Sequence, residues 1–368
     1  MTKKTGLSAL TEQLFGKRSI DRLRLSKMLF SGELEARRAQ RVKEGDLPWR
    51  ILHYRRTVDP EKVGYPISNY HLVLPDTLDT HLSYLTKNCR VVSLDTLADL
   101  ISENRPIPEK TVALTFDGGW IDNFVYAYPL LLKHRVPATM FLPTAFIGTT
   151  NYFWQDKIMF ALVIMMQKGL PFLPFDFFGP EERALVQRVS PGGAIDLPLI
   201  FVVISILALR TPPERFQALS ILGSVVQKIG GDLPAEPAFM SWDDAKLMDA
   251  GGISFGSMSH KHALFTEMTP EAIRQDIRAA DELLNQNFKH VSSVFCLPEA
   301  AVSAAALRVL AEENIEFTVG QHEGQIITAA GAPSILPRVS LFEANSASTE
   351  TFACRLWLGE DALTEGGE

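Results

Sequence analysis

The chain has 368 residues, of which 46% are hydrophobic and 21% are charged, and its formal net charge at pH 7 is -7. This composition predicts a globular protein with a large core, in one large domain or two smaller ones. The acidic balance, with no basic stripe in the body of the chain, argues against a nucleic-acid binder.

The first 48 residues form a basic arm, with 11 Lys and Arg against 6 Asp and Glu. Within it, Ile20, Leu23 and further apolar residues up to Phe30 recur at loosely helical spacing. Such a basic amphipathic helix can lie on an anionic membrane surface; the alternative is an ordinary helix docked on its own domain. The arm lacks the features of a secretory signal. We therefore expect a cytoplasmic protein, peripheral to the inner membrane surface if the arm binds lipid.

From residue 49 to 345, short apolar runs alternate with helical segments, which is typical of a β/α sheet or barrel. The expected strands are Ile51–Tyr54, Val112–Phe116, Ala138–Leu142, Ile253–Ser257, Ser293–Leu297 and Glu316–Val319. The expected helices are Leu78–Thr86, Asp122–His134, Pro270–Asn287 and Ala304–Glu313. At the third of these, Thr269 can cap the first turn and Pro270 suits the first helical position.

Residues 151–239 interrupt this alternation and predict a mostly helical insertion, acting as a lid or an interaction subdomain. Its apolar run Leu197–Leu209 contains Pro198 and has 13 residues, whereas a membrane span needs about 20. A buried helix or strand is the better interpretation. Residues 346–368 are expected to form a C-terminal tail. The three cysteines, Cys89, Cys296 and Cys354, are far apart and show no zinc-ligand spacing.

Asp117 is the first candidate for a functional residue, because it follows an apolar strand in the stretch LTFDGGW. In a barrel of parallel strands, functional residues lie at the C-terminal ends of the strands. The two glycines after Asp117 permit a sharp turn and the close approach of a ligand, and Trp120 could offer an aromatic platform. The alternative is a turn residue that caps the next helix, and the tetrapeptide FDGG does not decide between them.

His260 and His262 follow another expected strand, in GSMSHKHALFT. Two imidazoles at a strand end could bind a metal, act as acid and base, or be ordinary surface histidines.

In chain order, several segments resemble the polysaccharide deacetylase family, also called carbohydrate esterase family 4 or the NodB-homology domain. They are TVALTFDGGWIDNF, MSWDDAKLMDAGGISFGSMSHKHALFT, VSSVFCLPEA and ILPRVSLF, and the resemblance spans roughly residues 48–342. It implies a distorted (β/α)7 TIM-like barrel with the helical insertion already noted. It also implies removal of an acetyl group from a sugar by a divalent metal such as zinc, with an aspartate as base and a histidine as acid.

The metal ligands that the resemblance implies are incomplete. The family's TFDDG motif places the base at Asp117 and a ligand at position 118, which is Gly118. Its GSHTxxH motif places two histidine ligands at Met258 and His262. Two of three ligands are therefore missing, and because zinc sites use three or four protein or water ligands, we expect no metal cofactor. A rescue by His260 paired with His262 has the wrong spacing.

Other positions keep or lose the family pattern. The third motif reads CLPEA, so Pro298 remains while Glu299 and Ala300 replace the aromatic residue and the glycine. Without a metal, Asp117 needs a positive partner; Arg55, Arg56 and Arg338 are the candidates, and Arg338 is preferred, with a structural salt bridge elsewhere as the alternative. We expect catalytic roles for Asp117, His262 and Arg338. Substrate contacts are expected from Trp120, His260, Arg55 and Pro298.

Three functions remain open. The first is a metal-independent hydrolase of an acylated amino sugar or glycolipid precursor, with Asp117 as base and His262 as acid. The second is a non-catalytic pseudoenzyme that binds a carbohydrate or a protein partner. The third, a metal-dependent deacetylase with a rearranged site, predicts stoichiometric metal in the purified protein. The sequence does not indicate the oligomeric state.

Overall fold

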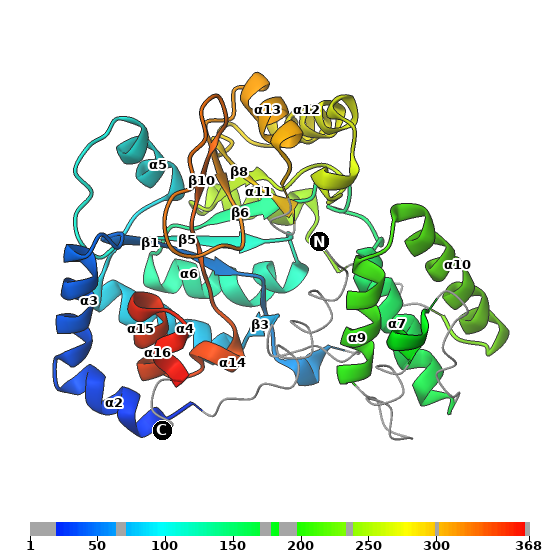
Figure 1. Ribbon diagram of the computed structural model, residues 1–368, viewed down its shortest axis with the longest axis horizontal. Helices are drawn as coiled ribbons and strands as arrows, with labels where there is room; N and C mark the ends of the chain where they lie inside the picture. Colours follow the sequence, from blue (N-terminus) through cyan, green and yellow to red (C-terminus); the bar gives the residue numbers. More distant parts are fainter. Residues whose placement is uncertain are drawn as a thin grey trace. The chain divides into compact units, whose positions relative to one another are not determined.

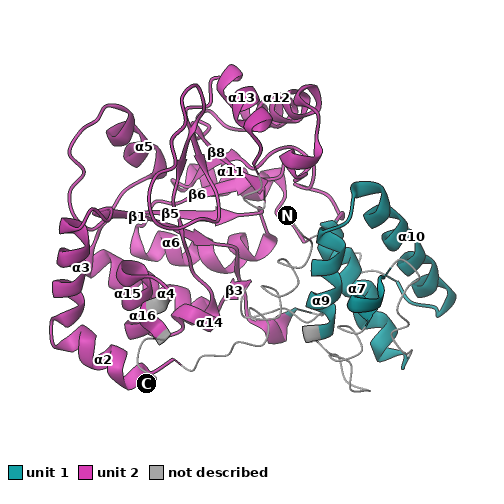
Figure 2. Ribbon diagram, viewed as in Figure 1, with its two compact units in different colours: residues 1–19, 63–68, 152–236 teal, residues 20–62, 69–151, 237–368 magenta. Residues whose placement is uncertain are grey.

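The computed structural model describes residues 20–63, 71–169, 178–183, 197–232, 238–298 and 302–364. The chain divides into two compact units, shown in different colours in Figure 2. Unit 1 comprises Met1–Ser19, Val63–Ser68 and Tyr152–Glu236, and unit 2 comprises Ile20–Lys62, Asn69–Asn151 and Pro237–Glu368. Glu299, Ala300 and residues 1–19 of the predicted arm lie outside the described residues.

Unit 2 is built on parallel strands (Figure 1). The larger sheet has the order β11-β1-β5-β6-β7, with β4 paired to β5. Its strands are β1 (Trp49–Tyr54), β4 (Arg90–Val91), β5 (Thr111–Asp117), β6 (Thr139–Leu142), β7 (Ser254–Ser257) and β11 (Val339–Ser340). A second sheet has the order β10-β9-β8, with β8 (Val294–Cys296), β9 (Phe317–Val319) and β10 (Ser334–Leu336). A short pair joins β2 (Arg56–Thr57) to β3 (Leu72–Val73).

The two larger sheets share one core, which gives the fold its barrel character. A single parallel bridge, Phe255↔Val291, links the β7 side to the β8 side. One hydrophobic cluster collects side chains from both sheets, including Ile51, Phe141, Val294 and Val319. The strands therefore surround a common interior, although the ladder of hydrogen bonds is incomplete between β7 and β8. All six expected strands are confirmed within one to two residues at each end.

Helices accompany the strands in unit 2. They are α2 (Arg22–Phe30), α3 (Glu33–Lys43), α4 (Pro75–Asn88), α5 (Leu94–Ser102), α6 (Tyr128–His134), α11 (Trp242–Ala250), α12 (Pro270–Asn287), α13 (Ala304–Glu312), α14 (Glu343–Ser346), α15 (Thr349–Leu358) and α16 (Asp361–Thr364). Three single-turn elements are η1 (Pro60–Lys62), the π-type η2 (Asn123–Ala127) and η3 (Phe265–Glu267). The helix predicted for residues 270–287 has these bounds, because Thr269 caps the amide of Ala272 and Pro270 occupies the first turn.

Unit 1 is helical in its described part, with α7 (Trp154–Gln167), α9 (Leu197–Ala208) and α10 (Pro212–Lys228). The apolar run that begins at Leu197 is therefore a helix, and its Ile200, Val203 and Ile206 are buried. Among the described residues, no helix is both long and apolar enough to cross a membrane.

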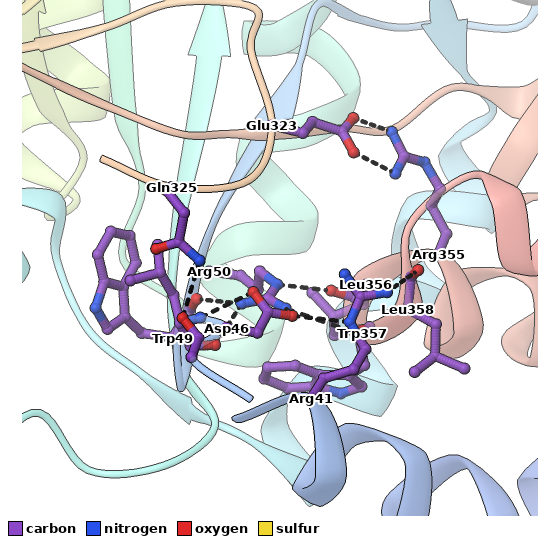
Figure 3. Close-up of polar contacts among 12 residues, drawn as sticks. Arg41, Asp46, Trp49, Arg50, Glu323, Gln325, Arg355, Leu356, Trp357 and Leu358 are labelled. Atoms are coloured by element: carbon purple, nitrogen blue, oxygen red, sulfur yellow. Dashed lines mark hydrogen bonds and ion pairs between the residues drawn. The ribbon is translucent and has the colours of Figure 1, made fainter. Parts of the chain in front are cut away.

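The C-terminal segment differs from the predicted tail, because it contains the buried helix α15. Figure 3 shows how this helix ends against α3 and β1: Arg41 Nη1 donates to the carbonyl of Leu358 at 2.6 Å, and Arg50 Nε donates to that of Leu356 at 3.1 Å. The guanidinium of Arg50 also lies 5.5 Å from the ring centre of Trp357. Cationic groups at a helix C-terminus satisfy its unpaired carbonyls and its dipole. Residues 349–358 are thus part of the core of unit 2.

The described part of the basic arm is also docked on unit 2. Leu25 and Met28 of α2 are buried, while Leu23 and Phe30 are 83% and 84% exposed. The apolar residues of the arm therefore separate into a face packed on the domain and a stripe in solvent.

Candidate active site

The inward-facing side chains at the C-terminal strand ends form a polar group above the apolar interior. Successive residues of a strand point to opposite faces, so residues two apart share one face, and the apolar core residues and the polar site residues follow one another along that face. Trp49 and Ile51 lead to His53, and Ala113 leads to Asp117. The same spacing leads from Val294 to Cys296 and from Leu336 to Arg338.

Asp117 and Arg338 form a buried bidentate ion pair. Arg338 Nη1 lies 2.7 Å from Asp117 Oδ1, and Nη2 lies 2.7 Å from Oδ2. The exposed fractions are 3% for Asp117 and 1% for Arg338. Arg338 also donates from Nε to the carbonyl of Gly320 and from Nη1 to Thr115 Oγ1. The structure thus brings the preferred pair together, with both carboxylate oxygens engaged.

The ion pair decides the protonation state of Asp117. Burial by itself raises the pKa of a carboxyl group, but the positive charge of Arg338 and the proximity of His53 outweigh it and hold the pKa of Asp117 well below its ordinary value. The pKa of Arg338 is raised correspondingly by Asp117 against the effect of burial. Asp117 is therefore an anion near pH 7.

His53 lies on the other side of the same carboxylate. Its Nε2 is 3.1 Å from Asp117 Oδ2, and its Nδ1 is 3.0 Å from Ser340 Oγ. Burial is the main cause that lowers the pKa of His53, with Arg338 and Arg55 contributing against the opposing effect of Asp117. The imidazole is accordingly neutral near pH 7.

Cys296 completes this group from β8. Its Sγ lies 3.5 Å from Asp117 Oδ2 and 3.6 Å from Arg338 Nη2. Burial and the nearby carboxylate raise the pKa of the thiol well above its ordinary value. Cys296 is a neutral donor here, not a thiolate nucleophile.

Gly118, at the position of a missing metal ligand, has no room for a side chain. Its φ is +100°, and a Cβ there would lie 2.5 Å from Nε1 of Trp120. Trp120 is 2% exposed, is stacked on Phe239 at 4.8 Å, and has the guanidinium of Arg56 4.5 Å from its ring centre. The expectation that Trp120 offers an open platform for substrate therefore does not agree with the structure, in which it is an interior residue that fills the place of the ligand.

Met258, at the second missing position, belongs to the hydrophobic core cluster and is 4% exposed. A divalent ion at Asp117 would have to displace Arg338, and it would find neither a carboxylate at Gly118 nor an imidazole at Met258. Across the described parts of the chain, no group of three or more His, Cys, Asp or Glu side chains is arranged to hold a metal. The residues present do not fit the divalent ion that the family resemblance implies.

The loop after β7 holds His260 and His262. The amide of His260 donates to Asp276 Oδ1 at 2.7 Å, and its Nδ1 lies 2.9 Å from Thr144 Oγ1. The amide of His262 donates to Ser259 Oγ, and its φ is +53°. His260 thus has a clear structural role in fixing the loop. The role of His262 as an acid stays a prediction.

The remaining candidates separate by their partners. Arg56 forms a buried ion pair with Asp122, with Nε 2.5 Å from Oδ2, so it is committed elsewhere. Arg55 lies partly exposed directly after β1. Pro298 is buried after β8, next to the residues 299–301 that fall outside the described part. Of the three candidate arginines, Arg338 contacts Asp117 and Arg55 stays a candidate for substrate.

The parallel strands around a common core, with charged side chains at their C-terminal ends, place the chain among the α/β-barrel proteins, which carry their functional residues at that end of the strands. The family model for polysaccharide deacetylase matches residues 104–188 and 215–318, which together are just over half of the chain. The chain therefore belongs to the polysaccharide deacetylase family.

Individual relatives are distant. YxkH of Bacillus subtilis (strain 168) is 26% identical over 112 residues, which cover 28% of this chain and only 39% of that relative. Among solved structures, the deacetylase PplD of Streptococcus pyogenes, in complex with acetate, has a TM-score of 0.52 at 17% identity and covers 84% of this chain and 98% of its own. IcaB from Ammonifex degensii has a TM-score of 0.50 at 14% identity, covering 84% and 97%. At these identities the structural likeness establishes the fold.

Proposed function

We propose that this chain acts on an acylated amino sugar or glycolipid precursor at the mouth of the barrel, without the divalent metal of its family. The observation that carries the proposal is the bidentate pair of Asp117 and Arg338. A guanidinium supplies the positive charge beside this carboxylate that a metal would otherwise supply. The indole of Trp120 fills the space beside Gly118. The positive charge of the proposed site therefore comes from the guanidinium of Arg338.

The buried charges support a functional site at the strand ends, whether it acts in catalysis or in binding. Removing ions from water costs several kcal/mol per ion, and apolar residues of similar volume often stabilise a protein as well or better. Asp117, Arg338 and the titratable His53 are nevertheless all buried at the strand ends, where barrels of this type carry function. Titratable groups with strongly shifted pKa values cluster at functional sites.

The roles within such a site need to respect the contacts of Asp117. A general base needs a pKa near the working pH and an oxygen directed at the proton it removes. The pKa of Asp117 is far too low, and Arg338 occupies both oxygens. These contacts favour Asp117 as an orienting anion over the base role that the family resemblance implies. His262 remains the candidate acid.

A non-catalytic protein that binds a carbohydrate or a protein partner is the second candidate. The same ion pair favours it, because a carboxylate neutralised by arginine has lost the reactivity on which the family depends. Both functions require binding of a glycan or another partner, but only the hydrolase would release an acyl group.

The deciding experiment incubates the purified protein with an N-acetylated amino-sugar oligosaccharide and measures released acetate. Release that persists in the presence of a chelator and falls in His262→Ala supports the hydrolase. Glycan binding by calorimetry without any release of acetate supports the second candidate. Release that requires added zinc would refute the metal-free site.

Peripheral contact with an anionic membrane through the basic arm belongs to the same proposal. Leu23 and Phe30 are the most exposed large hydrophobic residues in the described chain, and Lys27 lies between them along α2. Residues four and three apart share one helix face. Sedimentation with anionic vesicles should drop for the variant Leu23→Ser/Phe30→Ser, whereas the same change at Leu247 of α11, which is 59% exposed, should leave it unaltered. Equal sedimentation of both variants would contradict the contact.

A further inference from the structure

Ser340 and His53 are neighbours at the barrel mouth. Strand β11 pairs with β1 in parallel, with His53 opposite Ser340. Ser340 Oγ lies 3.0 Å from His53 Nδ1, which is hydrogen-bonding distance. Ser340 is partly exposed whereas His53 is buried. Ser340 is thus the solvent-accessible member of the pair, and the imidazole of His53 is the buried one.

The second ring nitrogen of His53 faces an anion. Its Nε2 is 3.1 Å from Asp117 Oδ2, a close electrostatic contact that does not meet hydrogen-bond geometry, and Arg338 holds that carboxylate from the other side. Because Asp117 is ionised, the proton of the neutral imidazole belongs on Nε2, beside the negative charge. Nδ1 is then left as an acceptor for the hydroxyl proton of Ser340. A nucleophile within reach of a base that a third group orients is the general signature of covalent catalysis.

We infer that Ser340 is a nucleophile for acyl transfer, with His53 as its general base and Asp117 as the residue that positions His53. This goes beyond the proposed function, because the family resemblance implies no covalent intermediate and because a reactive serine is measurable without the sugar. The imidazole is used in the opposite sense to the familiar serine hydrolase triad, with the carboxylate at Nε2 and the hydroxyl at Nδ1. Both nitrogens can transfer a proton, and such triads are recognised by geometry and roles.

The reaction proceeds in two balanced steps. In the first, Ser340 Oγ bonds to the acyl carbon while its proton moves to His53 Nδ1. The bond from that carbon to the sugar nitrogen or oxygen then breaks, and the leaving atom takes the proton from Nδ1, so that in this mechanism His53 takes the place of His262 as the acid. In the second, water attacks the acyl-serine and gives a proton to Nδ1; the bond to Oγ breaks, Oγ regains the proton, and a carboxylic acid leaves. No metal, oxidant or reductant takes part.

The test uses diisopropyl fluorophosphate on the full chain, followed by mass spectrometry of the intact protein and of its peptides. Attack by Ser340 Oγ on phosphorus expels fluoride and leaves a phosphoryl adduct. We expect one adduct per chain on Ser340, no adduct in Ser340→Ala, and a labelling rate about 10²-fold lower in His53→Asn, because this is the usual contribution of a general base. Ser334→Ala, at a partly exposed serine of β10, should label like the wild type.

The pH profile tests the positioning role of Asp117. The charges that act on His53 are Asp117, Arg338 and Arg55, so labelling should rise with a midpoint below the ordinary histidine value of 6.5. Asp117→Asn removes the charge that favours protonated His53 and should move the midpoint to lower pH, which a purely structural role would not do. A second variant, Ser340→Cys, is first checked for folding by thermal melting. Its new thiol should then be acylated faster by a thiol-directed reagent than the thiol of the double variant Ser340→Cys/His53→Asn.

An adduct at another residue, an unlabelled wild type beside a serine hydrolase that labels fully, or equal labelling of wild type and His53→Asn would overturn the inference. These outcomes differ from failure of the proposed function. Labelling of Ser340 without release of acetate from the amino sugar would leave the nucleophile in place and remove the sugar substrate.

Discussion

Replacing Arg338 by methionine tests how the buried anion is stabilised. The change keeps much of the side-chain volume but removes all four hydrogen bonds that the guanidinium makes to Asp117, Thr115 and Gly320. Breaking a buried pair from one side leaves an uncompensated charge, which costs about 3–5 kcal/mol. We therefore expect the free energy of unfolding to fall by about this amount in urea titrations monitored by tryptophan fluorescence.

The contribution of Asp117 to the pH dependence of stability should also change sign in this variant. In the wild type the pKa of Asp117 is lowered on folding, so its contribution to stability is present above the ordinary value of 3.8 and is lost as the pH falls below it. Without Arg338, only His53 opposes the effect of burial, and we expect the pKa of Asp117 in the folded variant to exceed the ordinary value of 3.8. Asp117 then binds its proton more tightly in the folded variant than in the unfolded chain, so its contribution to the stability should fall as the pH rises.

Two controls frame the experiment. Arg278→Met removes an ion pair with Glu313 at 2.9 Å, but Arg278 is 66% exposed, so the loss should stay below about 1 kcal/mol. The double variant Asp117→Leu/Arg338→Met removes both charges and should recover much of the stability. If Arg338→Met lay within about 1 kcal/mol of the wild type with an unchanged pH slope, the ion pair would not be the stabilising element that we describe.

Two further perturbations follow from the same structure. Gly118→Asp should bind no zinc in calorimetric titrations and should lose about 1–3 kcal/mol of stability, because φ is +100° and a Cβ meets the neighbouring indole. The control Gly331→Asp, at φ +72° with nothing within 4 Å, should lose less stability. Stoichiometric zinc in Gly118→Asp would contradict a site filled by Trp120. Burial lowers the pKa of His81 from 6.5 to about 4, so between these pH values the unfolded chain binds a proton that the folded chain does not. Up to about 3 kcal/mol of stability should therefore be lost as the pH falls through this range. In denaturant titrations, the free energy of unfolding of His81→Asn should depend less steeply on pH, and an equal dependence would exclude His81 as the cause.

The strands and several helices of unit 2 could be predicted from the sequence, because local signals and tertiary structure agree there. Buried parallel strands are short apolar runs, and the run before Asp117 became β5 with two added residues. The helix at Pro270–Asn287 has a cap, a first-turn proline and apolar residues at Ile273, Ile277, Ala280 and Leu284, which share one face. The capping residues and the spacing of the apolar residues thus indicate the same helix.

The C-terminal helix was missed because its stability depends on distant residues. Ser348 caps α15, yet the helix is short and Arg41 and Arg50, some 300 positions earlier in the chain, complete its last turn. Short helices are marginal without tertiary packing. A sequence alone does not say which distant cations will meet its carbonyls.

The candidate site was predicted in part. The loss of metal-ligand residues and the preference for Arg338 beside Asp117 came from the motifs and from charge balance. His53, Cys296 and Ser340 were missed, although a period-two count along each strand from a core residue such as Ile51 would have placed His53 inward. Their convergence needed the register that sets His53 opposite Ser340 and Thr115. The place taken by Trp120 beside Gly118 depends on the backbone turn, which motifs do not encode.

The most direct test of the metal-free site measures acetate release from an N-acetylated amino-sugar oligosaccharide by matched samples of the protein, one dialysed against a chelator and one loaded with zinc. A site in which Arg338 stands in for the metal predicts equal rates in the two samples, with negligible bound zinc by elemental analysis. A rate that vanishes on chelation and returns with stoichiometric zinc would contradict the account.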